Sequence, residues 1–146
     1  MKTGINVGKK KMAVGRWGVI DLTYVDGILR ISPTDDMIYE LDDLIQFHKY
    51  VLSMTKGDRF LVLSDYREHH LDIDRDTLKY AAKNEWLHQT RIAEAVLLKS
   101  LPNLLISRFY IRTLKPLTPT KIFRNENTAL RWLEMWKDYG SLNKKV

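Results

Sequence analysis

Four consecutive apolar residues at positions 60–63, Phe-Leu-Val-Leu, constrain the fold of this chain most strongly. Turn-forming or polar residues bound the run, with Gly57 before it and Asp65 after it. A strand that is apolar at successive positions must bury both of its faces, which is typical of a mainly parallel sheet covered by helices. A helical pattern and a second apolar run, over residues 93–98, follow. This order predicts a strand, helix, strand crossover with residues 60–63 as the central strand.

The length and charge of the chain indicate one domain with basic ends. The 146 residues are enough to bury one core, and the absence of Cys excludes disulfides, thiolate zinc sites and cysteine nucleophiles. Five bases and no acids fall in residues 1–20, and ten bases and three acids fall in residues 99–146, within a net charge of +6. We expect a flexible basic arm over residues 1–14, a single domain over 15–140 and a basic tail over 141–146.

The cellular location is inferred from two features of the sequence. A chain without Cys fits a reducing compartment. No apolar segment follows the basic N-terminal residues that resembles a signal-peptide core or the roughly 20 residues of a membrane span. We therefore expect a cytoplasmic protein.

The first half of the chain predicts a hairpin followed by an amphipathic helix. Asp26-Gly27 separates two β-rich runs, which is the strongest short hairpin signal. A short strand is expected at residues 37–39. Apolar residues then recur at spacings of three and four over residues 41–52, and Gly57 follows as a helix cap.

The second half predicts a polar loop over residues 65–74, followed by alternating helices and strands. Asp72 or Asp74 begins a second helix, and Ser100 begins a third after a strand at residues 92–98. A strand at residues 121–123 precedes the last helix. The fold class is therefore α/β, with a mixed, mostly parallel sheet that opens with an antiparallel hairpin and with about four helices.

Several short segments resemble the SpoIIAA-like branch of the STAS fold. These are Leu63-Ser64-Asp65 at the end of the central strand, Thr118-Pro119 before the last strand, and the ending Phe123, Ala129 and Trp132-Leu133. The resemblance covers roughly residues 15–138. It implies a domain that binds rather than catalyses and that needs no cofactor. The same branch is similar to CRAL-TRIO lipid-transfer domains, which implies an apolar ligand or a membrane surface.

The sequence departs from the STAS pattern at the regulatory position. Anti-anti-sigma factors of that family carry a phosphorylated Ser in a segment that reads Asp-x-Ser-Ser-Gly. Here Asp65 is followed by Tyr66, and the next Ser or Thr is Thr77, inside the predicted second helix. The resemblance therefore does not extend to switching by phosphorylation.

The last two predicted helices carry the expected contact surface. They hold more apolar and aromatic residues than one buried stripe uses, and basic residues lie among them. Aromatic residues rimmed by cations suit a homodimer interface, a membrane surface or a pocket for an apolar small molecule. We expect a homodimer, with the other two as alternatives; weak nucleic-acid binding through the basic termini is less favoured, because no base-reading module is present. The predicted surface comprises Leu105, Phe109, Tyr110, Arg112, Arg131, Trp132, Met135 and Trp136.

The polar loop after the central strand is a second candidate site. Asp65, Tyr66, His69 and His70 follow the carboxyl end of a strand, where α/β folds place ligands. A small metal-assisted enzyme using His69, His70 and Asp72 is the alternative function. Adjacent histidines do not readily chelate one ion, and no nucleophile elbow, phosphate loop or dinucleotide fingerprint occurs. We therefore predict no metal, no cofactor and no catalytic residue, and a binding or regulatory domain.

Overall fold

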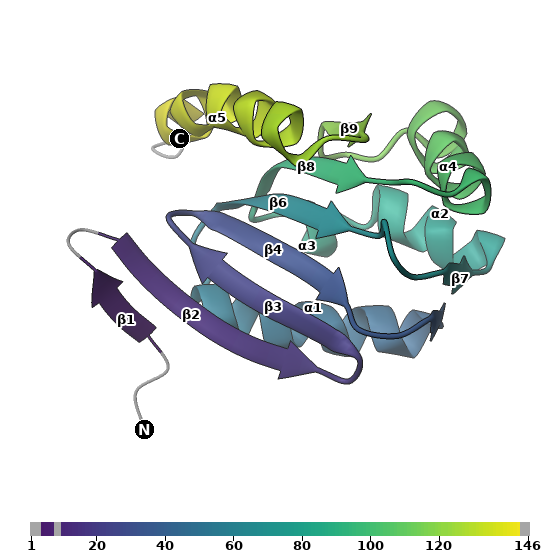
Figure 1. Cartoon of the computed structure of the whole chain (residues 1–146), viewed down its shortest axis with the longest axis horizontal. Helices are drawn as coiled ribbons and strands as arrows, with labels where there is room; N and C mark the ends of the chain where they lie inside the picture. The colour runs from purple at the N-terminus through teal and green to yellow at the C-terminus, as the bar shows by residue number, and fades with distance from the viewer. Residues whose placement is uncertain (1–3, 8–9, 144–146) are drawn as a thin grey trace.

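A mixed seven-stranded sheet forms the centre of the protein in a computed structural model that describes residues 4–7 and 10–143 (Figure 1). The strand order is β1-β2-β3-β4-β6-β8-β9. The first four strands pair antiparallel, and β4, β6, β8 and β9 pair parallel. The strands are β1 (Gly4–Val7), β2 (Lys10–Trp17), β3 (Ile20–Val25), β4 (Ile28–Pro33), β6 (Phe60–Asp65), β8 (Arg91–Leu97) and β9 (Thr120–Phe123).

The helices connect the parallel strands, and two further strands pair outside the main sheet. These two are β5 (Met37–Tyr39) and β7 (Leu71–Ile73), which run parallel to each other. The helices are α1 (Leu41–Thr55), α2 (Arg75–Lys83), α3 (Glu85–His88), α4 (Leu101–Arg108), the π-helix η1 (Phe109–Leu114) and α5 (Glu126–Asn143). The predicted α/β class, with its antiparallel opening and mostly parallel remainder, is confirmed.

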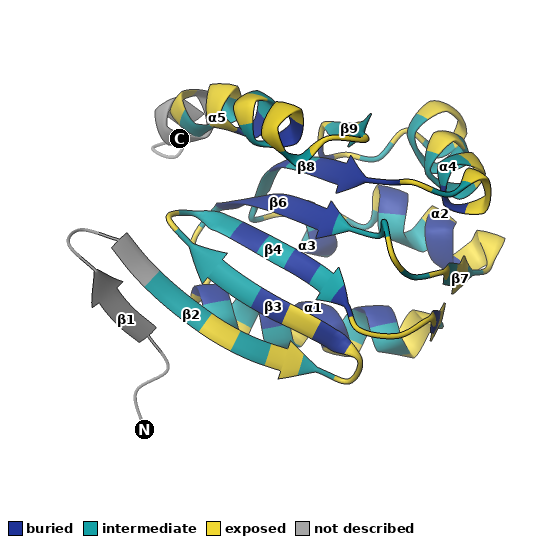
Figure 2. Cartoon of the chain, viewed as in Figure 1, coloured by how far each residue is buried: buried dark blue, intermediate teal, exposed yellow. Residues whose placement is uncertain are grey.

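Strand β6 is buried on both faces, as the apolar run predicts. Phe60 and Val62 belong to a core cluster that includes residues of α1, and Leu61 and Leu63 belong to a second cluster that includes residues of α5. Each of the four is at most 1% exposed. Since successive side chains of a strand point to opposite faces, β6 contributes to the hydrophobic core on both sides of the sheet. Figure 2 shows β6 and β8 buried along most of their length, with exposed residues on β2.

Small residues let α5 pack closely on its side of the sheet. Ala93 and Ala95 on β8 and Ala129 on α5 are fully buried in the same cluster. Helix α1 lies on the opposite face of the sheet, behind β2 and β3 in Figure 1. The two helices thus cover different parts of the sheet on opposite faces.

Several local signals act as expected. Asp26 and Gly27 both have positive φ angles, 54° and 79°, which suits the two-residue hairpin between β3 and β4. The side chain of Asp74 accepts a hydrogen bond from the Thr77 N–H and caps α2. Helix α1 ends at Thr55, and its C-cap is Lys56 in the left-handed conformation, one residue before the expected Gly57.

The structure differs from the sequence expectations at both ends of the chain. Residues 4–7 and 10–14 of the expected basic arm lie in β1 and β2, because β2 pairs with β3 over six positions and β1 adds to β2. Strand pairing depends on the neighbouring strand more than on composition, so a Lys-rich segment is drawn into the sheet. Of the expected tail, residues 141–143 continue α5, and the other three lie outside the described residues.

The middle of the chain also contains elements that the sequence did not predict. Strand β7 forms inside the expected polar loop over residues 65–74, because residues 71–73 find a partner in β5. A short helix, α3, precedes β8, and the π-helix η1 extends α4. The described residues therefore contain five α-helices and one π-helix, where the sequence predicts about four helices. No helix in the described part of the chain is long and apolar enough to cross a membrane.

Candidate functional site

A groove of about 350 Å³ runs along β9, the last strand of the main sheet. Residues 120–124 form one wall, and α4 with η1 forms the other. Because successive side chains of a strand point to opposite faces, contact with five consecutive residues means that the groove follows the edge of β9. The groove is lined by Leu104, Arg108, Ile111, Arg112, Thr120, Lys121, Ile122, Phe123 and Arg124.

The backbone of β9 presents hydrogen-bonding groups along this edge. The Glu94 N–H donates to the Pro119 carbonyl at 2.8 Å, and the Leu98 N–H donates to the Phe123 carbonyl at 3.0 Å. Since the backbone of a parallel strand alternates between its two neighbours, the N–H and C=O groups of Ile122 point away from β8. No strand in the described part of the chain pairs with this edge. The edge is therefore open to an added strand.

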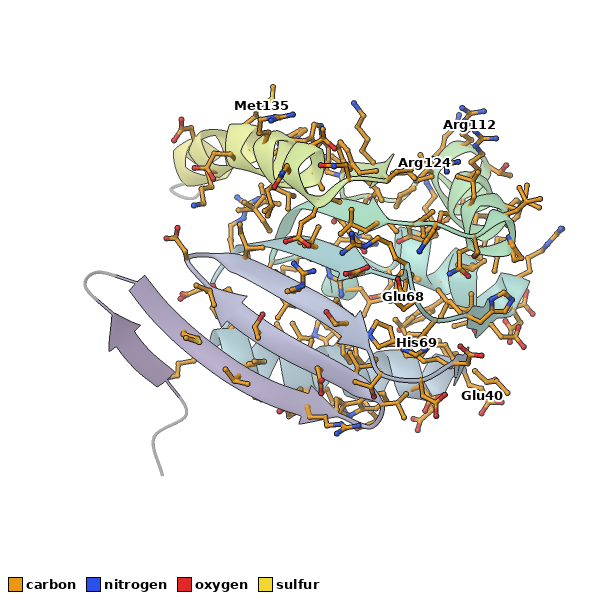
Figure 3. All side chains as sticks on the ribbon, in the orientation of Figure 1. Glu40, Glu68, His69, Arg112, Arg124 and Met135 are labelled. Atoms are coloured by element: carbon orange, nitrogen blue, oxygen red, sulfur yellow. The ribbon has the colours of Figure 1, made fainter. Side chains whose placement is uncertain are left out.

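The groove is strongly basic. Arg108, Arg112, Lys121 and Arg124 are all exposed, and no acidic residue lines the groove. Within the described residues, none of these four forms an ion pair with a carboxylate; Lys121 lies 5.5 Å from the ring centre of Phe123 instead. Figure 3 shows Arg112 and Arg124 on the same side of the molecule, by α4 and β9. An anionic partner would meet four cations whose charge is not neutralised locally.

Local sequence signals build the helical wall. Ser100 caps α4, and Pro102 lies in the first turn, where its missing N–H breaks no helical bond. The helix continues directly into the π-helix η1, an uncommon conformation that is frequent at functional sites. Lys115, with a φ angle of 54°, ends the segment before the chain returns to β9. Ile111 and Arg112 reach the groove from the π-helical segment.

A second groove of about 150 Å³ adjoins the first near the carboxyl end of β9. It is lined by residues 98–101 together with Leu104, Ile122 and Arg124, and the last three residues line both grooves. Lys99 adds another cation and contacts Glu68 only at 3.9 Å, with both side chains more than 70% exposed. The two grooves together follow β9 beyond its carboxyl end.

Asp65 lies outside this groove, in a network of ion pairs. The Arg67 guanidinium donates to both Asp65 oxygens, at 2.9 and 2.8 Å, and Arg30 donates to Asp65 at 3.1 Å and to Glu126 at 2.8 Å. The hydrogen bond from Arg67 is the main cause that lowers the pKa of Asp65 below its usual range. The hydrogen bond from Arg30 is the main cause that lowers the pKa of Glu126. The network joins β4, β6 and α5. Because each of its charges already has an opposite partner, it leaves no charge free to bind a ligand.

The other predicted loop residues are dispersed. Tyr66 lines a partly open cavity, whereas His69 contacts Asp36 at 3.6 Å and the His70 N–H donates to Asp36 at 2.8 Å. In Figure 3, His69 and Glu68 lie on the connection that follows β6. No group of three or more His, Cys, Asp or Glu side chains in the described residues is close enough to hold a metal ion. The loop thus offers no ligand set for the metal-assisted alternative.

The predicted contact surface divides into two parts. Trp132 and Trp136 pack against the core cluster under α5, and Trp132 lies 5.6 Å from the Phe123 ring. Met135, 74% exposed, points to solvent from α5 (Figure 3), and Arg131 is exposed on the same helix. The remaining members lie on α4 and η1. Leu105 is 56% exposed, and Phe109 packs under Arg75. Tyr110 lines the same cavity as Tyr66, and Arg112 lines the groove.

Of the groove residues, the predicted contact surface includes Arg112 but not Lys121 or Ile122. One signal was present in the sequence. Residues 99–125 contain six basic residues and no acidic residue. Such a run marks a basic surface, although only the fold shows that two of its segments face each other across a groove.

Comparisons with known proteins match this chain to a domain family and to solved structures. A family model described as "Domain of unknown function (DUF7793)" matches residues 22–137. A solved structure of an uncharacterized protein from the DUF3478 family of Shewanella loihica PV-4, described as having a SpoIIAA-like fold, is 16% identical, with a TM-score of 0.49; the match covers 85% of this chain and 93% of that chain. A search of curated proteins finds no match.

Proposed function

The chain belongs to the DUF7793 family of domains of unknown function, and from that premise we propose that it is a non-enzymatic binding domain for an acidic, partly apolar peptide segment. The segment binds in extended form along β9 and extends the sheet. The observation that carries this proposal is the groove itself, in which an open strand edge lies among four cations and no acid.

The backbone of β9 supports strand addition. The outward-facing N–H and C=O groups of Ile122 have the spacing that an extended peptide needs, and main-chain bonds of this kind supply affinity in many peptide-binding domains. Alternate side chains of the peptide then point to the two faces of the sheet. On one face they reach Ile122 and the helical wall at Leu104 and Ile111, and on the other they reach Lys121 and Phe123.

Charge complementarity supports an acidic partner. Arg108 and Arg112 come from the helical wall and Lys121 and Arg124 from the strand wall, so acidic side chains on either side of the peptide meet a cation. Guanidinium groups bind carboxylates with two parallel hydrogen bonds, which favours arginine-rich surfaces for this purpose. Apolar side chains at the alternate positions contact the groove floor.

The test uses a fluorescent peptide in which Glu alternates with Ile or Val, measured by anisotropy against the whole chain. We expect saturable binding that weakens as salt is raised, since exposed ion pairs are screened. The double variant Arg112→Glu and Arg124→Glu should weaken binding at least about tenfold. Arg131→Glu, an exposed charge reversal on α5, is the matched control and should change affinity little.

Two modified peptides separate strand addition from charge attraction. N-methylation of every second peptide amide removes donors on one edge of the added strand, and shifting the methyl groups by one residue removes those on the other edge. Strand addition predicts that one pattern abolishes binding and the other leaves it nearly unchanged. Equal binding of both patterns, or binding that ignores the charge reversals, contradicts the proposal.

Two other occupants give different results in the same measurements. Anionic vesicles that bind the chain in place of the peptide indicate a membrane surface, the alternative that exposed Leu101 and Leu105 favour. A homodimer in which a second copy supplies the strand appears in sedimentation as a dimer that the Arg112→Glu and Arg124→Glu variant dissociates. Either result, without peptide binding, replaces the acidic peptide as the occupant.

A further inference from the structure

A partly open cavity of about 120 Å³ lies beside the groove, and Ile111 and Thr120 line both. Side chains from α1, α2, α4 and η1 and from β5 and β7 line it, together with strands of the main sheet. Its volume is close to the roughly 150 Å³ of an engineered apolar cavity that holds one benzene molecule. Most of the lining is apolar, including Leu44, Phe47, Leu78, Ile106 and Ile111. A molecule of about one small ring therefore fits it.

Polar groups gather where the cavity meets the sheet. The Ser64 hydroxyl donates to Glu94 at 2.9 Å, and an Arg91 guanidinium nitrogen lies 3.5 Å from the other Glu94 oxygen. Both charged side chains are nearly buried, with 12% of Arg91 and 15% of Glu94 exposed. The Nε–H of Arg91 is buried and has no hydrogen-bond partner among the described residues. A buried donor without an acceptor is costly, so an acceptor atom on a ligand would relieve it.

Three tyrosines add further donors around the same space. Tyr39, Tyr66 and Tyr110 all line the cavity. Burial is the main cause that raises the pKa of each, so their hydroxyls keep their protons at neutral pH. The Tyr110 hydroxyl contacts the Ala81 carbonyl at 3.4 Å. Each of these hydroxyls can donate a hydrogen bond, and so can the unpartnered Arg91 Nε–H.

The charges of the cavity select a neutral ligand. Arg91 and Glu94 already balance each other, so a ligand carboxylate would leave one negative charge unpaired in a poorly solvated space. A neutral ligand atom can accept a hydrogen bond from a free donor without adding an unpaired charge. We infer that the cavity binds a neutral, mainly apolar small molecule that carries a carbonyl or similar acceptor. The polar groups of this site, Arg91, Glu94 and the three tyrosines, do not line the peptide groove, although Ile111 and Thr120 border both.

The experiment uses three probes of similar size. Cyclohexanone is neutral with a carbonyl, methylcyclohexane lacks an acceptor, and cyclopentanecarboxylate is anionic. Binding to the whole chain is followed by saturable NMR shifts of the amide and tyrosine ring signals. We expect cyclohexanone to bind with a dissociation constant of about 1 mM or below, several-fold tighter than either other probe.

Two variants test the location and the donor. Ala81→Leu fills the cavity and should abolish the saturable shifts, whereas Lys79→Leu, at an exposed position of the same helix, should leave them unchanged. Arg91→Lys keeps the charge opposite Glu94 but removes the Nε–H, and should weaken cyclohexanone about 3- to 10-fold without affecting methylcyclohexane. Amide spectra of each variant confirm that it remains folded.

Several outcomes overturn the inference. These are the absence of saturable shifts with cyclohexanone at millimolar concentration, tighter binding of the carboxylate, equal binding of the ketone and the hydrocarbon, or unchanged binding to a folded Ala81→Leu variant. None of these results bears on the peptide groove, because the probes carry no peptide backbone. Failure of one proposal is therefore distinguishable from failure of the other.

Discussion

The Arg30 guanidinium on β4 donates a 2.8 Å hydrogen bond to the Glu126 carboxylate in the first turn of α5, 96 positions away in the chain. Arg30 also binds Asp65, so a single side chain links the antiparallel half of the sheet to the central strand and to the last helix.

The Arg30 and Glu126 pair is expected to contribute modestly to stability. A double-mutant cycle with Arg30→Met and Glu126→Gln should give a coupling energy of about 0.5 to 1 kcal/mol, because both side chains are partly exposed. Urea unfolding at low and at high salt measures this coupling, which should shrink at high salt. A coupling that is zero at low salt contradicts the role assigned to the pair.

Asn103 is expected to hold the connection after β6 in place. Its side-chain amide donates to the Tyr66 and His69 carbonyls, both at 3.0 Å, and the residue is 3% exposed. Asn103→Ala should lower the free energy of unfolding by about 2 to 3 kcal/mol, because two buried carbonyls lose their donor. Chemical denaturation measures the loss, and hydrogen exchange should accelerate at the His70 and Leu71 amides. Pro102→Ala, at the exposed neighbouring position, should cost far less.

Gly15 is expected to be required where β2 meets α1. A Cβ at this position would overlap the Tyr50 hydroxyl, which also accepts a 3.2 Å hydrogen bond from the Arg16 N–H. Gly15→Ala should therefore destabilise the fold by about 1 to 3 kcal/mol. Tyr50→Phe removes the overlapping atom, so the double variant should lose less than the two single losses added together. Additive losses in thermal unfolding would contradict the steric explanation, and Val14→Ala, on the opposite face, serves as the control.

His48 is expected to make stability depend on pH. Burial is the main cause that lowers its pKa from 6.5 to about 4, and its Nε2 lies 3.2 Å from the Trp86 carbonyl. The unfolded chain therefore binds a proton between pH 6.5 and about 4 that the folded chain does not bind. Stability is highest above pH 6.5 and should fall by about 3 kcal/mol as the pH drops through this window.

The variant His48→Phe should flatten this pH dependence in urea unfolding series. A smaller slope should remain from His88, because burial lowers its pKa as well. An unchanged slope in His48→Phe would show that His48 is not the group responsible.

Local chemistry explains why much of the fold was predictable. The run at residues 60–63 has no polar position, so a strand there must be buried on both faces, and the structure buries it between α1 and α5. The Asp26-Gly27 turn and the caps at Asp74 and Ser100 are also local, because each depends on residues within a few positions.

Which of the contact-surface residues are buried depends on how the helices pack on the sheet, and spacing in the sequence does not show this. Trp132 and Leu105 are both apolar residues of amphipathic helices, yet Trp132 packs on the core and Leu105 is exposed. The spacing of these residues in the sequence does not show which of the two is buried. Strand β7 was missed for the same reason, since residues 71–73 are a strand only where β5 lies beside them.

By itself, the amino-acid sequence determined which segments must be buried, where the turns and caps fall, and that residues 99–125 carry bases without acids. These properties belong to single residues and their near neighbours. Only the tertiary structure decided that β9 is an edge strand, that Arg112 and Lys121 face one groove, and that Arg91 and Tyr66 line one cavity. Grooves and cavities lie between elements distant in sequence, so they exist only once the order of the strands and the packing of the helices are set.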